Sequence, residues 1–119
     1  MEYFESLEKE GKNIIAGDHP IITDGVTIVQ GVKLPALTIL GKITTGANKG
    51  KYTKYNIDAI DGNQEPDCIL KYDVDATSRE ENSIAFFHAE LNKAMIVDID
   101  ENAIQSLRSK GIFLKEVLE

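Results

Sequence analysis

The sequence predicts a mainly β fold of short strands with one late α-helix. Short runs rich in β-branched residues lie between residues 14 and 57, as is typical of strands. Nine glycines and three prolines predict many turns between such runs. One segment near the C-terminus carries apolar residues at helical spacing, so a single helix is expected there.

Turn residues divide the strand-forming part of the chain. Residues 26–29 are β-branched throughout and follow a turn-like segment at residues 23–25. Glycine and lysine between residues 45 and 50 predict a flexible hairpin tip, and Asp61-Gly62 is a second strong turn signal. The strands expected on these grounds are 26–29, 37–44, 51–55, 67–75 and 84–90.

The expected helix has an apolar stripe on one face. The stripe consists of Ile99, Ala103, Ile104 and Leu107. Either Asp98 or Asp100 can cap the N-terminus of this helix. Gly111 suits the position just beyond its C-terminus, and an apolar run at residues 112–114 follows.

The chain is expected to form one domain, residues 14–119, preceded by a polar arm, residues 1–13. A chain of 119 residues buries enough surface to fold around one core without disulfides or metal. Tyr3, Phe4 and Leu7 have helical spacing, but so short a helix is marginal alone. The arm is therefore either a frayed terminus or a docking segment that becomes ordered against a partner.

Composition excludes several classes of function. The formal net charge of −7 argues against generic binding to nucleic acid. The single Cys68 excludes an internal disulfide framework, and its apolar neighbours predict a buried thiol. We recognise no signal peptide and no stretch of membrane-spanning length, so we expect synthesis in a cytosol-like compartment and no membrane partner.

No motif predicts catalysis or a bound cofactor or metal, so we do not expect an enzyme. Residues 98–102 begin like a calcium loop, but the glycine and the final glutamate of such a loop are missing. Neither His19 nor His88 has a second ligand at metal-binding spacing. Catalysis would need a deep pocket that combines His88 with Asp73 and Asp75.

Lysines and acidic residues are segregated in the middle of the chain. Residues 42–57 contain four lysines and no acidic residue, whereas acidic residues recur between 58 and 67. Such a layout can steer a protein partner or pair neighbouring subunits, or it can belong to a solvated hairpin. Both interpretations stay open. The candidate contact residues are Lys49, Lys51, Lys54 and Asp61.

Several short motifs follow one another along the chain between residues 13 and 114. The motifs are AGDHPIIT at 16–23, VTI at 26–28, TILGKIT at 38–44, DG at 61–62 with Pro66, IL at 69–70 before DVDAT at 73–77, and GIF at 111–113. Together they resemble the phage lambda-like head decoration, or capsid cementing, protein D family. Leu37 and Ala89 stand where that family usually has glycine.

The resemblance implies a β-clip-like small barrel or sandwich, α+β by content. It also implies a viral capsid decoration protein that binds as a homotrimer at three-fold positions of the expanded icosahedral head and stabilises it against internal DNA pressure. Its partners would be the major capsid protein and further copies of the same chain. The homotrimer could be one that forms only on the capsid. Its location would be the outer surface of the virion, after synthesis in the host cytoplasm.

The resemblance also assigns roles to residues. The N-terminal arm would face the capsid and add a strand to it. The capsid-binding anchors would be Tyr3, Phe4, Leu7, Ile14 and Ile15. Lys49, Lys51, Lys54 and Asp61 become possible subunit or capsid contacts. The alternative is another virion accessory or glycan-binding β module, for which Tyr52 and Tyr55 beside the hairpin are the support.

Overall fold

The computed structural model describes residues 20–116, which form mostly strands with one α-helix near the C-terminus. The mainly β expectation is therefore confirmed. The elements in chain order are β1 (Ile22–Ile28), β2 (Lys33–Leu34), β3 (Ile39–Lys42), β4 (Tyr52–Lys54), β5 (Pro66–Leu70), β6 (Val74–Asp75), β7 (Glu81–Asn92), a 3-10 turn η1 (Lys93–Met95), α2 (Glu101–Ser109) and β8 (Ile112–Lys115).

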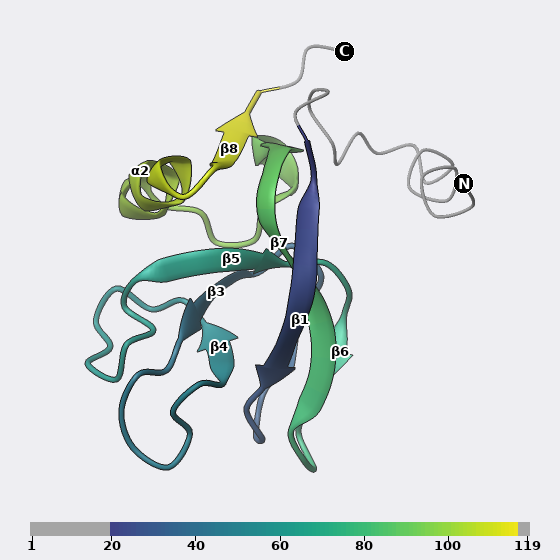
Figure 1. Ribbon diagram of the computed structural model, residues 1–119, viewed down its shortest axis with the longest axis vertical. Helices are drawn as coiled ribbons and strands as arrows, with labels where there is room; N and C mark the ends of the chain where they lie inside the picture. The colour runs from purple at the N-terminus through teal and green to yellow at the C-terminus, as the bar shows by residue number, and fades with distance from the viewer. Residues whose placement is uncertain (1–19, 117–119) are drawn as a thin grey trace.

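Five strands close into a small barrel in the order β1-β4-β3-β5-β7, because β1 pairs with both β4 and β7. The antiparallel ladder between β1 and β7 runs from Ile22 opposite His88 to Ile28 opposite Glu81. β8 extends the sheet beyond β7 as a parallel neighbour. β2 and β6 form a separate two-stranded ribbon. Figure 1 shows the long β7 beside β1, with β8 and α2 at one end of the molecule.

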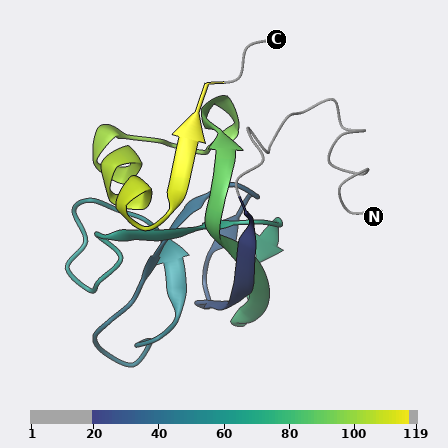
Figure 2. The ribbon, with the colours of Figure 1, turned by 45° about the horizontal axis from the view of Figure 1, so that its top comes forward.

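Two buried clusters lie on opposite faces of the barrel wall. The inner cluster takes residues from all five barrel strands and therefore fills the barrel. The outer cluster joins the other face of β3, β5 and β7 to α2 and β8, which cover that face (Figure 2). Because successive residues of a strand point to opposite faces, Ile39 enters the outer cluster and Leu40 the inner one. Strands buried on both faces carry apolar residues without alternation.

The helix α2 lies where its apolar stripe predicts, with Ala103 and Leu107 fully buried. Its N-cap is Asp100, whose carboxylate accepts a hydrogen bond from the N–H of Ala103 at 2.7 Å. Asp98, the other expected cap, lies before the helix with a φ of 50° and forms an ion pair with Lys54. The capping role therefore belongs to Asp100.

A buried tyrosine ties the start of α2 to the barrel. The Tyr55 hydroxyl donates to Asp100 Oδ1 at 3.2 Å and accepts from Asn102 Nδ2 at 3.0 Å. Burial of the ring raises the pKa of the Tyr55 hydroxyl, so it stays a neutral donor. The residue after β4 and the first turn of α2 are thus held together through one shared carboxylate.

The expected strands at 26–29, 37–44, 51–55 and 84–90 are confirmed as β1, β3, β4 and β7, with different ends. The turn expected at residues 23–25 is wrong. Asp24 and Gly25 lie inside β1, opposite Ala85 and Ile84 of β7. The long partner strand supplies ladder hydrogen bonds that outweigh the local turn preference of an Asp-Gly pair.

The single strand expected at 67–75 is also wrong, because the chain bends at residues 71–73 and forms β5 and β6 instead. After the bend, Val74 pairs with Leu34 of β2, a two-residue strand too short to show a periodic pattern in the sequence. Asp73 and Asp75 therefore do not share one face of a continuous strand.

Leu37 adopts the left-handed backbone conformation, with a φ of 68°. Its N–H donates to the carbonyl of Leu70 at 2.7 Å, and its carbonyl accepts from the N–H of Val97 at 3.0 Å. Its side chain is buried in the outer cluster. Burying a leucine contributes about 1.5–3 kcal/mol, which offsets the roughly 1–2 kcal/mol cost of left-handed backbone in an L-residue. The turn therefore forms without glycine.

Replacing Asp100 with alanine is expected to lower the free energy of unfolding by about 1–3 kcal/mol, because Ala103 N–H and the Tyr55 hydroxyl lose their acceptor. Glu101→Ala, at the next and exposed position, is the matched control and should change it by less than about 0.5 kcal/mol. Urea unfolding followed by circular dichroism measures both. Equal losses in the two variants would contradict the role given to the Asp100 carboxylate.

Candidate functional site

The first described residue, Pro20, lies against the layer formed by β7, β8 and α2. Its carbonyl oxygen accepts a hydrogen bond from His88 Nδ1 at 3.2 Å. The imidazole packs directly on Gly111, where a Cβ would stand 2.2 Å from His88 Cδ2. Gly111 also has a φ of 96°, so its position excludes a side chain for two reasons. His88 therefore joins the start of β1 to the junction of α2 and β8.

The expected capsid-binding anchors Tyr3, Phe4, Leu7, Ile14 and Ile15 all lie outside the described residues, as does the whole arm 1–13. The structure does describe the point where that part of the chain joins the barrel. It is the end of β1 at which His88 and Gly111 meet.

Two of the candidate contact lysines have acidic partners within the chain. Lys51 Nζ lies 2.5 Å from Glu80 Oε1, and Lys54 forms an ion pair with Asp98. Water reaches all four side chains, so each pair contributes about 0–1 kcal/mol. A partner protein can therefore exchange these contacts for its own at low cost.

Lys49 and Asp61 lie on two loops that pack against each other. Lys49 lies in the connection between β3 and β4, and Asp61 in the connection between β4 and β5. The N–H of Thr44 donates to the Asp61 carbonyl at 2.7 Å and links the two loops. Of the four sequence-predicted contact residues, Lys49 and Asp61 thus lie on adjoining loops, whereas Lys51 and Lys54 pair with Glu80 and Asp98.

The loop of residues 55–65 connects β4 to β5 and passes over β3, which lies between those two strands in the sheet. The crossing is at Gly41, where a Cβ would stand 2.5 Å from the Cα of Asn63 and 2.7 Å from its carbonyl oxygen. Only glycine lets the two backbones approach so closely. The side chain of Asn63 also donates to the carbonyl of Lys54 at 3.2 Å, so the loop packs on β3 and is bonded to the last residue of β4.

This fixed loop presents two isoleucines to solvent. Ile60 is 88% exposed and Ile57 is 55% exposed. Asp58 and Asp61 flank Ile60 in the sequence. Sequence reasoning missed this surface, although two isoleucines in a segment otherwise made of turn residues were an available signal.

A second surface is an open hollow of about 460 Å³ at the ribbon of β2 and β6. Its walls are mainly apolar. The lining residues are Lys33, Leu34, Pro35, Asp73, Val74 and Asp75. Leu34 and Val74 are buried and form its floor, whereas Lys33 and Pro35 are exposed at its rim.

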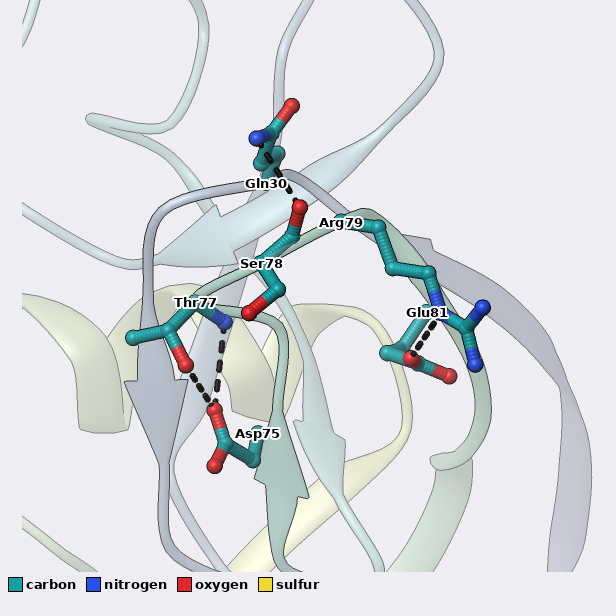
Figure 3. A network of polar contacts seen from close by, with 6 residues as sticks. All are labelled: Gln30, Asp75, Thr77, Ser78, Arg79 and Glu81. Carbon is teal, nitrogen blue, oxygen red and sulfur yellow. Dashed lines mark hydrogen bonds and ion pairs between the residues drawn. The ribbon is translucent and has the colours of Figure 1, made fainter.

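The two carboxylates at this hollow serve the backbone of their own chain. Asp73 Oδ1 accepts from the N–H of Ala36 at 2.7 Å. Asp75 Oδ1 accepts from the hydroxyl and the N–H of Thr77, the latter at 3.1 Å (Figure 3). The Thr77 hydroxyl bond lowers the pKa of the Asp75 carboxyl, which is therefore ionised at neutral pH. In the same network Gln30 Nε2 donates to the carbonyl of Ser78 at 3.1 Å.

The groups that catalysis would need lie apart. The hollow beside Asp73 and Asp75 is not lined by His88, which contacts Pro20 and Gly111 instead. Cys68 is fully buried, and burial raises the pKa of its thiol, so it is not a nucleophilic thiolate. Among residues 20–116, no group of three or more His, Cys, Asp or Glu side chains could hold a metal ion.

Tyr52 and Tyr55 do not form an exposed aromatic surface. The two side chains are 8% and 7% exposed. Tyr52 packs inside the barrel, edge-on to Phe87 at a ring separation of 6.4 Å. The support expected for a glycan-binding module is therefore wrong. Within the described residues, no helix has the length and apolar character to cross a membrane.

A family model described as bacteriophage lambda head decoration protein D matches residues 8–112 of this chain. The matched range contains all five barrel strands, the ribbon of β2 and β6, and α2. Comparison with curated proteins gives no match.

Gly41→Ala is expected to destabilise the protein by about 1–3 kcal/mol or more, because the new Cβ must displace the backbone of Asn63. Gly25→Ala is the matched control, since its Cβ would meet nothing closer than the Ser83 carbonyl at 3.9 Å. That variant should unfold within about 1 kcal/mol of the unaltered protein. Chemical unfolding of both variants tests the crossing, which a harmless Gly41→Ala would refute.

Proposed function

Because the chain belongs to the bacteriophage lambda head decoration protein D family, we propose that it binds as a trimer at three-fold positions of the expanded icosahedral head and stabilises the head against internal DNA pressure. Membership gives it a structural, capsid decoration role in the virion. The single observation that carries the proposal is the family match over residues 8–112.

The proposal assigns residues 1–13 to a docking arm and residues 14–119 to the domain that the arm anchors. In the described part of the chain, β1 begins at the end of the molecule where β8 ends (Figure 1). We place that end against the capsid and the opposite end, with the loops around β3 and β4, toward the outside of the virion. Synthesis would take place in the host cytoplasm.

The arm would bind by adding a strand to a sheet of the major capsid protein. In this mode backbone hydrogen bonds supply affinity, and side chains on alternate positions supply specificity. The proposed anchors are Tyr3, Phe4, Leu7, Ile14 and Ile15. Three linked arms in a trimer convert modest individual affinities into strong avidity.

Stabilisation follows from mass action. If the arm's site exists in the expanded shell and not in the unexpanded shell, each bound copy favours the expanded state. The stabilisation grows with the number of occupied sites and with the bridging of neighbouring capsomers. No catalytic step is required, which agrees with the separation of His88 from Asp73 and Asp75.

Deleting residues 1–15 is expected to leave a folded protein that no longer binds expanded capsids. All described residues of the β1–β7 ladder and of both buried clusters lie outside the deleted segment, so the far-ultraviolet circular dichroism should stay that of the full chain. Co-sedimentation with expanded empty capsids should fall at least tenfold, because the proposed anchors are lost.

A matched pair of full-length variants separates anchoring from simple truncation. Tyr3→Ser with Phe4→Ser should lose binding as the deletion does, whereas Lys9→Ser with Glu10→Ser, which keeps the net charge, should bind normally. An arm-less protein that still decorates expanded capsids would overturn the docking role.

A further inference from the structure

The chain contains two Asp-Gly pairs, Asp24-Gly25 in β1 and Asp61-Gly62 in the loop between β4 and β5. An Asp-Gly pair can rearrange without an enzyme, because glycine has no side chain to shield its amide nitrogen from the neighbouring carboxyl group. The two pairs have different surroundings in the folded protein, so their reactivity should differ.

The Gly25 amide points to the open edge of β1 and away from the ladder with β7. Ile84 lies opposite Gly25, and its carbonyl accepts from the N–H of Lys71 at 3.0 Å. Ile84 therefore turns its backbone groups toward β5, and Gly25 turns its own away from β7, because bonded and non-bonded pairs alternate along an antiparallel ladder. On the open side, within residues 20–116, β1 pairs with β4 at Ile28 alone. The Gly25 N–H is thus left to a side chain.

That side chain is the carboxylate of Asp24. The Gly25 N–H donates to Asp24 Oδ1 at 2.7 Å, and the carboxyl carbon Cγ is one bond from this oxygen. Both residues are exposed, and a Cβ at Gly25 would meet nothing closer than the Ser83 carbonyl at 3.9 Å. The nitrogen and the carboxyl group are therefore held together in a space that water reaches, which gives the proximity that an intramolecular reaction needs.

The second pair, Asp61-Gly62, is held apart and enclosed. The Gly62 N–H donates to Gln64 Oε1 at 2.8 Å, and the Asp61 carbonyl accepts from the N–H of Thr44 at 2.7 Å. A Cβ at Gly62 would stand 2.5 Å from Thr44 Oγ1 and 2.6 Å from the carbonyl of Lys42. The Gly62 nitrogen is therefore bonded away from the Asp61 carboxyl group, and the surrounding backbone blocks the rotation that would bring them together.

We propose that Asp24-Gly25 is a site of spontaneous isoaspartate formation in the folded protein, whereas Asp61-Gly62 is protected. The Gly25 nitrogen attacks Cγ of the protonated Asp24 carboxyl group. A C–N bond forms, and the carboxyl hydroxyl leaves as water with the amide proton, which gives a cyclic imide. Water then opens the imide. Opening at Cγ restores aspartate, and opening at the main-chain carbonyl carbon leaves the chain linked through Cγ. One water is lost and one is taken up, so no oxidant or other reactant is needed.

The rearrangement would act on the ladder that closes the barrel. An isoaspartate at residue 24 adds one main-chain atom to β1. The pairs on its two sides, Thr23 with Phe86 and Val26 with Ser83, can then both keep their register only if β1 bulges. A bulge leaves ladder groups unpaired. The modified protein should therefore unfold at a lower urea concentration than the unmodified protein.

Incubation of the full chain in mildly acidic buffer tests the proposal. One sample stays folded, below its unfolding transition, and a second is unfolded in urea. Each is digested after increasing times, and isoaspartate at residues 24 and 61 is counted by electron-transfer mass spectrometry of the peptides. In the folded protein we expect at least a tenfold excess at residue 24. In urea the two sites should agree within about twofold, because the surroundings that distinguish them are lost.

Gly25→Ala is the matched variant, because its Cβ fits the fold but shields the attacking nitrogen. It should lower isoaspartate at residue 24 at least tenfold and leave residue 61 unchanged. Equal formation at the two sites of the folded protein, or more at residue 61, would overturn the proposal. So would a folded protein without isoaspartate at residue 24 after the unfolded chain has formed it. A purified isoaspartate form with an unchanged urea midpoint would overturn the expected effect on the ladder.

Discussion

The antiparallel ladder between β1 and β7 is the interaction on which the rest of the structure depends. By pairing β1 with β7 it closes the barrel, and the same twelve-residue β7 continues past the barrel to pair with β8. One strand thus takes part in both buried clusters, inside the barrel through Ala85 and under α2 through Phe86 and Leu91. Because the side-chain period of a strand is two, a shift of one residue in this register would exchange the two cores.

The sequence predicts the parts of this fold that depend on local pattern. The stripe of α2, its glycine stop at Gly111 and the hairpin between β3 and β4 all follow from spacing and turn chemistry. The parts decided by distant partners are not predictable in this way. Asp24-Gly25 is a turn signal that β7 holds in a strand, and Leu37 takes a left-handed conformation because Leu70 and Val97 bind its backbone.

The same distinction applies to the functional surfaces. The charge pattern predicts the lysines as contacts for a partner protein. In the structure, Lys51 and Lys54 form ion pairs with Glu80 and Asp98, which lie far from them in the sequence. Ile60 was missed because exposure is a property of the folded loop, which the crossing at Gly41 fixes.

Co-sedimentation with empty capsids of the phage whose genome encodes this chain tests the capsid-decoration account most directly. The full chain is mixed with unexpanded and with expanded capsids, and the bound copies are counted at saturation. The account predicts binding to expanded capsids alone, at three copies per three-fold position. Binding to neither form, or equal binding to both, would contradict it.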